Sequence, residues 1–459
     1  MSDEHHSGLL YGLEQRIPPL PAFFSALQHV LAGLVGIITP PLIIGATLGL
    51  GDWLPYLISM SLLASGIGTF LQSNRVWGIG AGMICMQGTS FAFLGVAVAG
   101  GMWVKAQGGG PQDIMAMLFG VNFVAALVPV IVSRFIEPLK KIFTPIITGS
   151  VIALIGISLI KVSVINWCGG EKAQDFASMS NIALGAGTLG VIVLLSCAKN
   201  RWLRLSSVVV GIAVGCVAAG LSGQFHLHSL GDTLFRLPTL FPFGFQFNSA
   251  IFLPVALVSL VCILEAVGDL TANSLISQQS VDDRAFRNRL KGGILADGVS
   301  CMVAAMLSAF PNTTFAQNNG VIQMTGVASR YVGRYIGVIL ILLGLFPPVG
   351  ELLRQIPAPV LGGATMVMFG CVVAAGIRII TQNPLTRRDV LIVGLAFGAG
   401  LGVESVPAFL SHFPPMVGDL FGSAATSGGL VAIALNLVLP QEQAVTKTIR
   451  SQDDRAESV

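Results

Sequence analysis

Charge is scarce in this chain. Asp, Glu, Lys and Arg make up only 10% of its 459 residues, whereas a typical soluble protein carries about 25%. So few charges cannot cover a water-facing surface, which excludes a soluble globular fold. Apolar residues take their place at 53% of the chain, in runs long enough to span a lipid bilayer. We therefore expect an all-α polytopic membrane protein.

Several chemical signatures are also missing. The seven cysteines are odd in number, none forms a C-x-x-C pair, and most lie in apolar runs, so we expect buried thiols and no disulfide or metal site. No Ser/His/Asp set, nucleotide fingerprint or complete phosphate loop occurs. The sequence thus predicts no enzyme, no cofactor and no nucleic-acid partner. Residues 1–21 are polar and lack the order of a cleavable signal peptide.

Apolar segments recur fourteen times, and we interpret each as a transmembrane span. They are residues 22–45, 55–72, 86–100, 112–135, 142–162, 179–197, 204–222, 247–270, 290–309, 317–328, 334–352, 357–378, 388–403 and 425–440. With the N-terminus inside, twenty of the 25 Lys and Arg residues fall on the cytoplasmic side, as the positive-inside rule requires. This predicts an even number of spans and two cytoplasmic tails, residues 1–21 and 441–459.

The two halves of the chain resemble each other. LASG at Leu63–Gly66 returns as LADG at Leu295–Gly298, and VGIIT at Val35–Thr39 returns as VGDLT at Val267–Thr271. Both matches have an offset of 232 residues. Seven spans per half is an odd number, so the second copy must enter the membrane in the opposite direction. Such inverted repeats are typical of secondary transporters.

Two short segments carry polar residues where an apolar span is expected. Gln87 opens QGTSFAF in the first half, and Gln317 opens QNNG in the second; an offset of 230 aligns the two glutamines. Paired, interrupted spans in matching places mark the binding site of a transporter. We expect residues 87–91 and 316–320 to meet at the membrane midplane, each followed by a half-helix with free N–H groups. An amide cluster that only joins helices is the alternative.

Four ionisable residues fall inside the predicted spans: His29, Glu265, Asp269 and Asp297. Such groups are costly in a membrane and are usually functional. Glu265 and Asp269 are four residues apart, so they share one face of a helix. Two carboxylates there cannot both ionise cheaply, which suits proton carriage. For Asp269 and Asp297 the alternative is a buried acid bound by hydroxyls and backbone N–H groups, and for His29 it is a buried core histidine.

The stretch QNNGVIQMTG at Gln317–Gly326 resembles the signature of the nucleobase–ascorbate transporter family, also called nucleobase:cation symporter-2. That signature is Gln/Glu/Pro-Asn-x-Gly, four free residues, then Thr/Ser and Arg/Lys/Gly. Three further segments, LEAVGDLTA at Leu264–Ala272, LKGGILADG at Leu290–Gly298 and QGTSFAF at Gln87–Phe93, are also similar to the family, and to bacterial xanthine permeases in particular.

The resemblance implies fourteen spans as a seven-plus-seven inverted repeat, with short broken spans 3 and 10. It also implies a core domain of spans 1–4 and 8–11, a gate domain of spans 5–7 and 12–14, homodimers and an elevator movement of the core. The corresponding ranges are 22–135 and 247–352 for the core, and 136–222 and 353–440 for the gate.

The resemblance also implies residue roles. Glu265 and Gln317 should hold a nucleobase, Phe91 should stack on it, and the backbones around Ser90 and Ala316 should add hydrogen bonds. Residues matched to transport, proton coupling or support of the site are Asn318, Asp269, Asp297, His29, Gly320 and Thr325. The chemistry agrees, because a carboxylate accepts two N–H groups of a purine dione while a carboxamide both donates and accepts.

The sequence thus predicts a proton-coupled symporter of the bacterial inner membrane that imports xanthine or uric acid. Gln rather than Glu at position 317 favours a purine dione over uracil. The alternatives are a symporter for uracil or another nucleobase, and an anion transporter or channel on a similar inverted-repeat fold. The acid cluster around Glu265 disfavours anions, and the missing catalytic motifs disfavour a membrane enzyme.

Overall fold

The computed structural model describes residues 9–135, 144–170, 173–223, 234–281, 283–382, 384–413, 421–422 and 424–440. The chain is predominantly helical in these ranges. Seven described helices are long and apolar enough to cross a membrane, or eight if one bent pair counts as a single span. Most of the predicted tails, at 1–8 and 441–459, lies outside the described residues. So do six of the basic residues used for orientation: Lys140, Lys141, Lys172, Lys447, Arg450 and Arg455.

The helices follow the predicted apolar segments. In the first half they are α1 (Pro19–Thr47), α2 (Leu54–Asn74), η2 (Phe91–Phe93) with α3 (Leu94–Ala106), α4 (Pro111–Ala125) with α5 (Leu127–Val132), α7 (Pro145–Trp167), α8 (Met179–Ser196), α9 (Arg201–Leu205) and α10 (Ser207–Leu221). In the second half they are α11 (Ser249–Ile276), α12 (Arg284–Met306), α13 (Gln317–Thr325), α14 (Val332–Leu345) with α15 (Pro347–Arg354), α16 (Ala358–Ile380), α17 (Arg387–Ser405) and α19 (Ala424–Val438). All fourteen segments overlap a helix or helix pair, with ends shifted by a few residues; the number that span a bilayer stays a prediction.

The same order of elements recurs in both halves. Helices α1 and α11 start 230 residues apart, as do α2 and α12, whereas α7 and α16 start 213 residues apart and are each 23 residues long. Prolines open α4, α7 and α16, because the first turn of a helix does not need the N–H that proline lacks.

Two three-residue strands depart from the all-helical expectation. Strand β1 (Gln87–Thr89) pairs antiparallel with β2 (Asn312–Thr314), in a register that places Gly88 opposite Thr313. The two interrupted regions therefore meet, but through residues 312–314 rather than the predicted 316–320; their place at the membrane midplane stays a prediction. A Cβ at Gly88 would lie 2.2 Å from the Phe315 ring, so only glycine fits at the middle of β1.

The ladder does not place the two aligned glutamines opposite each other. Gln87 pairs with Thr314 in the ribbon. Gln317 instead begins α13, beyond the end of β2. The two glutamines were aligned because they are chemically alike, but Gln87 is a strand residue and Gln317 a helix residue.

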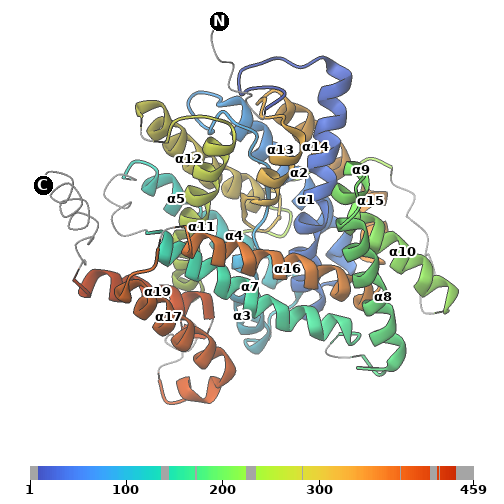
Figure 1. Cartoon of the computed structure of the whole chain (residues 1–459). Helices are drawn as coiled ribbons and strands as arrows, with labels where there is room; N and C mark the ends of the chain where they lie inside the picture. The colour runs from blue at the N-terminus through green and yellow to red at the C-terminus, as the bar shows by residue number, and fades with distance from the viewer. Residues whose placement is uncertain are drawn as a thin grey trace, which may run out of the picture.

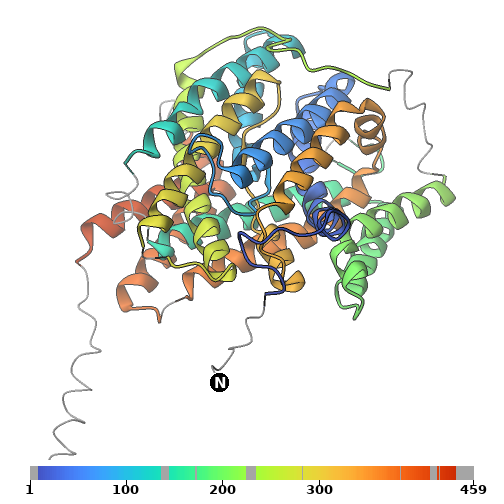
Figure 2. The ribbon, with the colours of Figure 1, turned by 90° about the horizontal axis from the view of Figure 1, so that it is seen from above.

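Two groups of helices surround the ribbon. Helices α7 and α16 run side by side, with α8 and α10 at one end of the pair and α17 and α19 at the other (Figures 1 and 2). A Cβ at Gly376 would lie 2.4 Å from the Ala153 nitrogen and 2.7 Å from the Gly149 oxygen, so the backbones of α7 and α16 are in contact. In the other group α2 packs on α14, and α12 packs on α2, α4 and α5.

The segment before α1 is attached to the loop that follows α13. The N–H groups of Leu10 and Tyr11 donate to the Gly326 oxygen, over 2.7 and 3.1 Å, and Arg330 forms an ion pair with Glu14 at 2.9 Å. Next to it, hydrogen bonds with Arg16 and Arg330 lower the pKa of the Tyr331 phenol. This contact fixes the end of α13 that lies away from the ribbon.

Candidate functional site

Two short helices begin where the strands of the ribbon end. The first starts at Phe91 and the second at Gln317, and both pack on α11. Within the described ranges, the N–H groups of Phe91, Ala316 and Gln317 donate no backbone hydrogen bond outside their helices. The first N–H groups of a helix are natural donors to a polar ligand.

The N–H of Ser90 itself is engaged within the ribbon. It donates to the Pro311 oxygen over 2.9 Å and so extends the ribbon. The Ser90 hydroxyl lies 3.6 Å from the Cys262 sulfur, which joins the ribbon to α11. Among the described residues, the N–H of Phe91, next to Ser90, and that of the exposed Ala316 donate no backbone hydrogen bond outside their helices, so the contribution of the backbones around Ser90 and Ala316 stays a prediction.

Asp297 on α12 is held by two glutamine side chains. The Gln72 and Gln87 Nε2 atoms donate to Asp297 Oδ1 over 2.8 and 2.7 Å, and only 6% of the aspartate is exposed. Gln72 also donates to the Gly293 oxygen over 2.9 Å and accepts from the Ala81 N–H over 3.0 Å. This carboxylate is therefore buried, but its partners are amides rather than the hydroxyls and backbone N–H groups of the buried-acid alternative; its role in transport stays a prediction.

Asp269 on α11 has a similar environment. The Asn319 Nδ2 atom donates to its Oδ1 over 2.6 Å and reaches its backbone oxygen over 3.3 Å, and 7% of Asp269 is exposed. Asn319 belongs to the first turn of α13. Asp269 therefore ties the second half-helix to α11.

Glu265 and Gln317 differ from both aspartates. Each is partly exposed, and within the described part of the chain neither side chain forms a hydrogen bond or an ion pair. Glu265 lies one turn before Asp269 on α11, the helix on which α13 packs. Their polar atoms are therefore available to a ligand.

Phe91 begins the first half-helix, which packs on α11. Its ring is partly exposed and forms a T-shaped contact with Phe369 of α16, with the ring centroids 5.1 Å apart. This contact holds the ring in place. Phe91 thus connects the ribbon with the α7–α16 pair.

The remaining predicted residues support α13 and its surroundings. His29 on α1 is 1% exposed and lies beside Asn318, whose Nδ2 atom donates to the Ile84 oxygen over 2.5 Å. Gly320 is helical and faces open space. Thr325 Oγ1 accepts from the Val327 N–H over 3.1 Å, next to Gly326, whose φ of +66° ends α13.

Two members of this network, Gln72 and Asn319, were not singled out from the sequence as partners of the buried acids. Gln72 lies close to the end of a predicted span, in FLQSN, where a polar side chain is expected near the membrane surface. Asn319 occupies the free position of the signature. Its place in a run of three amides is the signal that could have marked it.

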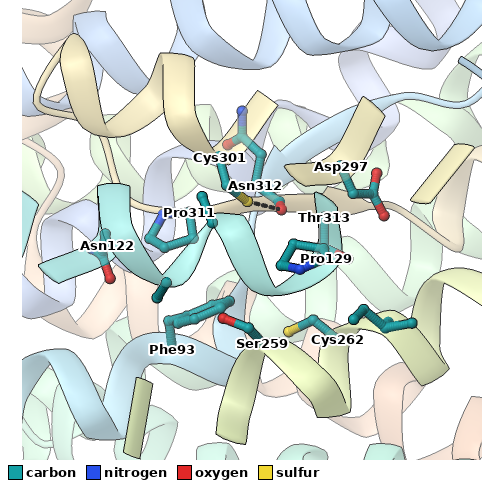
Figure 3. A pocket seen from close by; sticks show the side chains of 13 residues that line it. Phe93, Asn122, Pro129, Ser259, Cys262, Asp297, Cys301, Pro311, Asn312 and Thr313 are labelled. Atoms are coloured by element: carbon teal, nitrogen blue, oxygen red, sulfur yellow. Dashed lines mark hydrogen bonds between the residues drawn. The ribbon is translucent and has the colours of Figure 1, made fainter. Parts of the chain in front are cut away.

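A cavity lies on another side of Asp297 and contains neither Glu265 nor Gln317 (Figure 3). Its walls come from η2, α4, α5, α11, α12 and the residues leading into β2. The lining residues are Phe93, Asn122, Ala125, Ala126, Pro129, Ser259, Cys262, Ile263, Asp297, Cys301, Pro311, Asn312 and Thr313. Asp297 therefore has contact with the ribbon on one side and with this cavity on the other.

Comparison with known sequences gives matches along nearly the whole chain. The model of the Permease family (Xan_ur_permease) matches residues 21–409. Xanthine permease XanQ of Escherichia coli K12 is 43% identical over 448 residues, which cover 96% of each chain. Uric acid permease PucJ of Bacillus subtilis is 34% identical over 424 residues, or 90% of this chain and 92% of the relative.

Solved structures of low sequence identity share the fold. The transmembrane domain of the cyanobacterial bicarbonate transporter BicA gives a TM-score of 0.58 at 15% identity, covering 93% of this chain and 99% of that one. The murine anion transporter Slc26a9 gives 0.63 at 11% identity, covering 92% and 69%. The apolar helices and the permease relatives indicate an integral membrane transporter. The family match and the identities above 30% over nearly full length show that this chain belongs to the nucleobase–ascorbate transporter family of permeases.

Proposed function

We propose that this protein is a symporter that imports a purine dione, xanthine or uric acid, together with protons. The observation that carries the proposal is the contrast between the acids. Asp269 and Asp297 are buried and bound by amides, whereas Glu265 is partly exposed and has no partner among the described residues. A free carboxylate on α11 and a free carboxamide, Gln317, on the helix packed against it match the alternating N–H and C=O groups of a purine dione.

The surroundings of these two side chains fit such a substrate. Glu265 would accept from two N–H groups, Gln317 would donate to a ring carbonyl, and the Ala316 N–H would add a further donor. Stacking on Phe91 would contribute about 1–3 kcal/mol, as it does for bases in nucleic-acid-binding proteins. Relatives named as xanthine and uric acid permeases support this substrate class.

We further propose a seven-plus-seven inverted repeat that works as an elevator. The core domain comprises 22–135 and 247–352, and the gate domain 136–222 and 353–440. The recurring order of helices and the antiparallel ribbon support the repeat, and the close α7–α16 contact supports a gate built from both halves. The substrate would move with α11, α13 and the ribbon past the gate. We place the protein as a homodimer in the bacterial inner membrane, with both termini in the cytoplasm.

Proton coupling is assigned to the acids around the ribbon. Asp269 and Asp297 each accept hydrogen bonds from neutral amides and have no cationic partner in the described part of the chain. Such carboxylates gain a proton at lower cost than a salt-bridged one. His29 and Asn318 would support the site rather than contact the substrate.

An anion transporter is the second candidate, because the fold neighbours transport bicarbonate or other anions. Their identity to this chain is only 11–15%, so they inform on the fold alone. A free Glu265 carboxylate next to the half-helices would repel an anion but accept from N–H donors. We therefore favour the neutral base.

Uptake by purified protein in proteoliposomes tests the function. Labelled xanthine is offered under an imposed pH gradient, or under an imposed sodium gradient at equal pH, with uric acid, uracil, hypoxanthine and ascorbate as competitors. We expect accumulation with the pH gradient, and competition by uric acid rather than uracil or ascorbate. Accumulation that needs sodium and not the pH gradient would contradict proton coupling, and competition by bicarbonate alone would favour the anion transporter.

A further inference from the structure

The cavity beside Asp297 is lined by polar atoms without protein partners. Thr313 Oγ1 is buried, with its residue 3% exposed, and forms no hydrogen bond within the described ranges. Asp297 also lines the cavity, and both of its amide donors bind Oδ1, so Oδ2 has no donor there. Two unpaired oxygens at one cavity call for a hydrogen-bonding occupant.

The cavity is separate from the proposed substrate site. Strand β2 contributes Asn312 and Thr313 to the cavity, whereas neither Glu265 nor Gln317 lines it. The opposite wall consists of α4, α5 and α11, with Ser259 and Cys262 from α11 (Figure 3). An occupant here would touch Asp297 without displacing the base.

We propose that this cavity binds water, and that this water delivers a proton to Asp297 and takes it away during transport. The proposal rests on proton symport as the proposed function. The cavity has room for at least one water molecule, and its polar walls supply the two to four partners that a buried water needs. A hydronium ion transfers its proton to Asp297 Oδ2 and is left as water, and the reverse transfer releases the proton.

A sodium ion fits this cavity less well than water. The Asp297 charge is already balanced in part by two N–H donors on Oδ1, and two wall residues are thiols, Cys262 and Cys301, which are poor ligands for hard cations. The titratable groups nearest Asp297 are Glu265, Asp269, Cys262 and Cys85 on neighbouring elements and Cys301 on its own helix. None of these groups is cationic, so the cluster contains no positive charge to balance Asp297. We infer that a proton supplies it.

Radiolytic hydroxyl-radical footprinting of the purified full-length protein tests for the water directly, since internal water generates radicals that label the side chains around it. We expect oxidation of Cys262 and Cys301 to be faster than that of Cys85, because thiol oxidation depends on the surroundings of the sulfur. Cys85 is the control because it is also buried, at 1% exposed against 8% for Cys262 and 7% for Cys301, but lies outside the cavity. Equal rates at the three thiols would overturn the water site.

Two isosteric variants report on the same water through stability. Thr313→Val removes a hydroxyl that faces the cavity, and Thr89→Val removes a buried, unpartnered hydroxyl of β1 that does not. Removal of a truly unpaired buried hydroxyl stabilises a protein. Removal of a hydroxyl that forms a hydrogen bond with a bound water molecule does not. We expect a lower Tm for Thr313→Val than for Thr89→Val. Equal Tm values for the two variants would overturn the proposal. So would saturable stabilisation of the parent by sodium chloride, relative to choline chloride, if Thr313→Val abolishes it.

Filling the cavity tests the route of the proton. Ala126→Leu, with Ser259→Leu as a second filler, should lower pH-driven xanthine accumulation about tenfold or more, as loss of a proton relay does, and leave xanthine binding unchanged. Xanthine accumulation equal to that of the parent would overturn the proposal. A loss of xanthine binding in both variants that parallels the loss of accumulation would also overturn it. Failure of the parent to respond to a pH gradient would instead refute proton symport, while the footprint would still decide whether the cavity holds water.

Discussion

Glu265→Gln should weaken xanthine binding without weakening the fold. The Glu265 carboxylate is partly exposed and has no hydrogen bond among the described residues, so the substitution leaves no protein donor unpaired. It also removes a negative charge close to Asp269 and Asp297. The Tm of the variant should therefore equal or exceed that of the parent.

The expected loss of affinity follows from the lost acceptor. A carboxylate accepts from two N–H groups of the base, whereas the amide of Gln accepts from one and turns its NH₂ toward the other. One hydrogen bond to a charged group contributes about 1.5–3 kcal/mol. At about 1.4 kcal/mol per factor of ten, the Kd should rise about 10- to 150-fold.

The assay is equilibrium binding of labelled xanthine to purified variants, with Tm measured on the same samples. Glu404→Gln is the matched control, because Glu404 of α17 accepts a hydrogen bond from Ser158 of α7 and lies among the proposed gate helices. It should leave the Kd unchanged. A Kd for Glu265→Gln within twofold of the parent would remove Glu265 from the binding site, and Asp269 or Asp297 would have to take its place.

Three further variants test neighbouring parts of the argument. Gln317→Glu should weaken xanthine binding by about 1–3 kcal/mol, because a substrate carbonyl loses its amide donor, and an unchanged Kd would exclude Gln317 from the site. Asp269→Asn should reduce pH-driven accumulation more than binding, and the reverse order would assign Asp269 to the substrate. Gly376→Val should lower stability by about 1–3 kcal/mol through overpacking at the α7–α16 contact. Gly370→Val on the same helix faces open space and should be neutral in thermal unfolding, so equal effects would refute the close contact.

Lipid restricts the backbone so strongly that much of the fold follows from the sequence. A spanning segment must satisfy its own hydrogen bonds, so apolar runs predict helices, and all fourteen runs overlap helices here. The same rule explains why two interrupted runs had to meet. On its own, each strand of the ribbon would leave backbone N–H and C=O groups unpaired. The β1–β2 ladder pairs them with each other.

The hydrogen-bond partners of Asp269 and Asp297 could not be predicted from the pattern of apolar residues. Gln87 and Asp297 are 210 residues apart in sequence, and Gln72 and Asp297 are 225 apart. Their pairing depends on how α2, α12 and the ribbon pack. Local periodicity could show that an acid is buried, but not whether hydroxyls, amides or a ligand would bind it. For the same reason the sequence could not show that the Ser90 N–H is used within the ribbon.

The ribbon gives the proposed coupling a physical route. Strand β1 supplies Gln87 to Asp297 and then continues into Phe91, while β2 presents Thr313 to the cavity and then continues to Gln317. When Asp297 gains a proton, the charge to which Gln87 donates is lost and that hydrogen bond weakens. Because β1 and β2 are buried and paired residue by residue, a shift of Gln87 cannot be absorbed by solvent. We infer that it is passed to the starts of both half-helices, where the substrate is held.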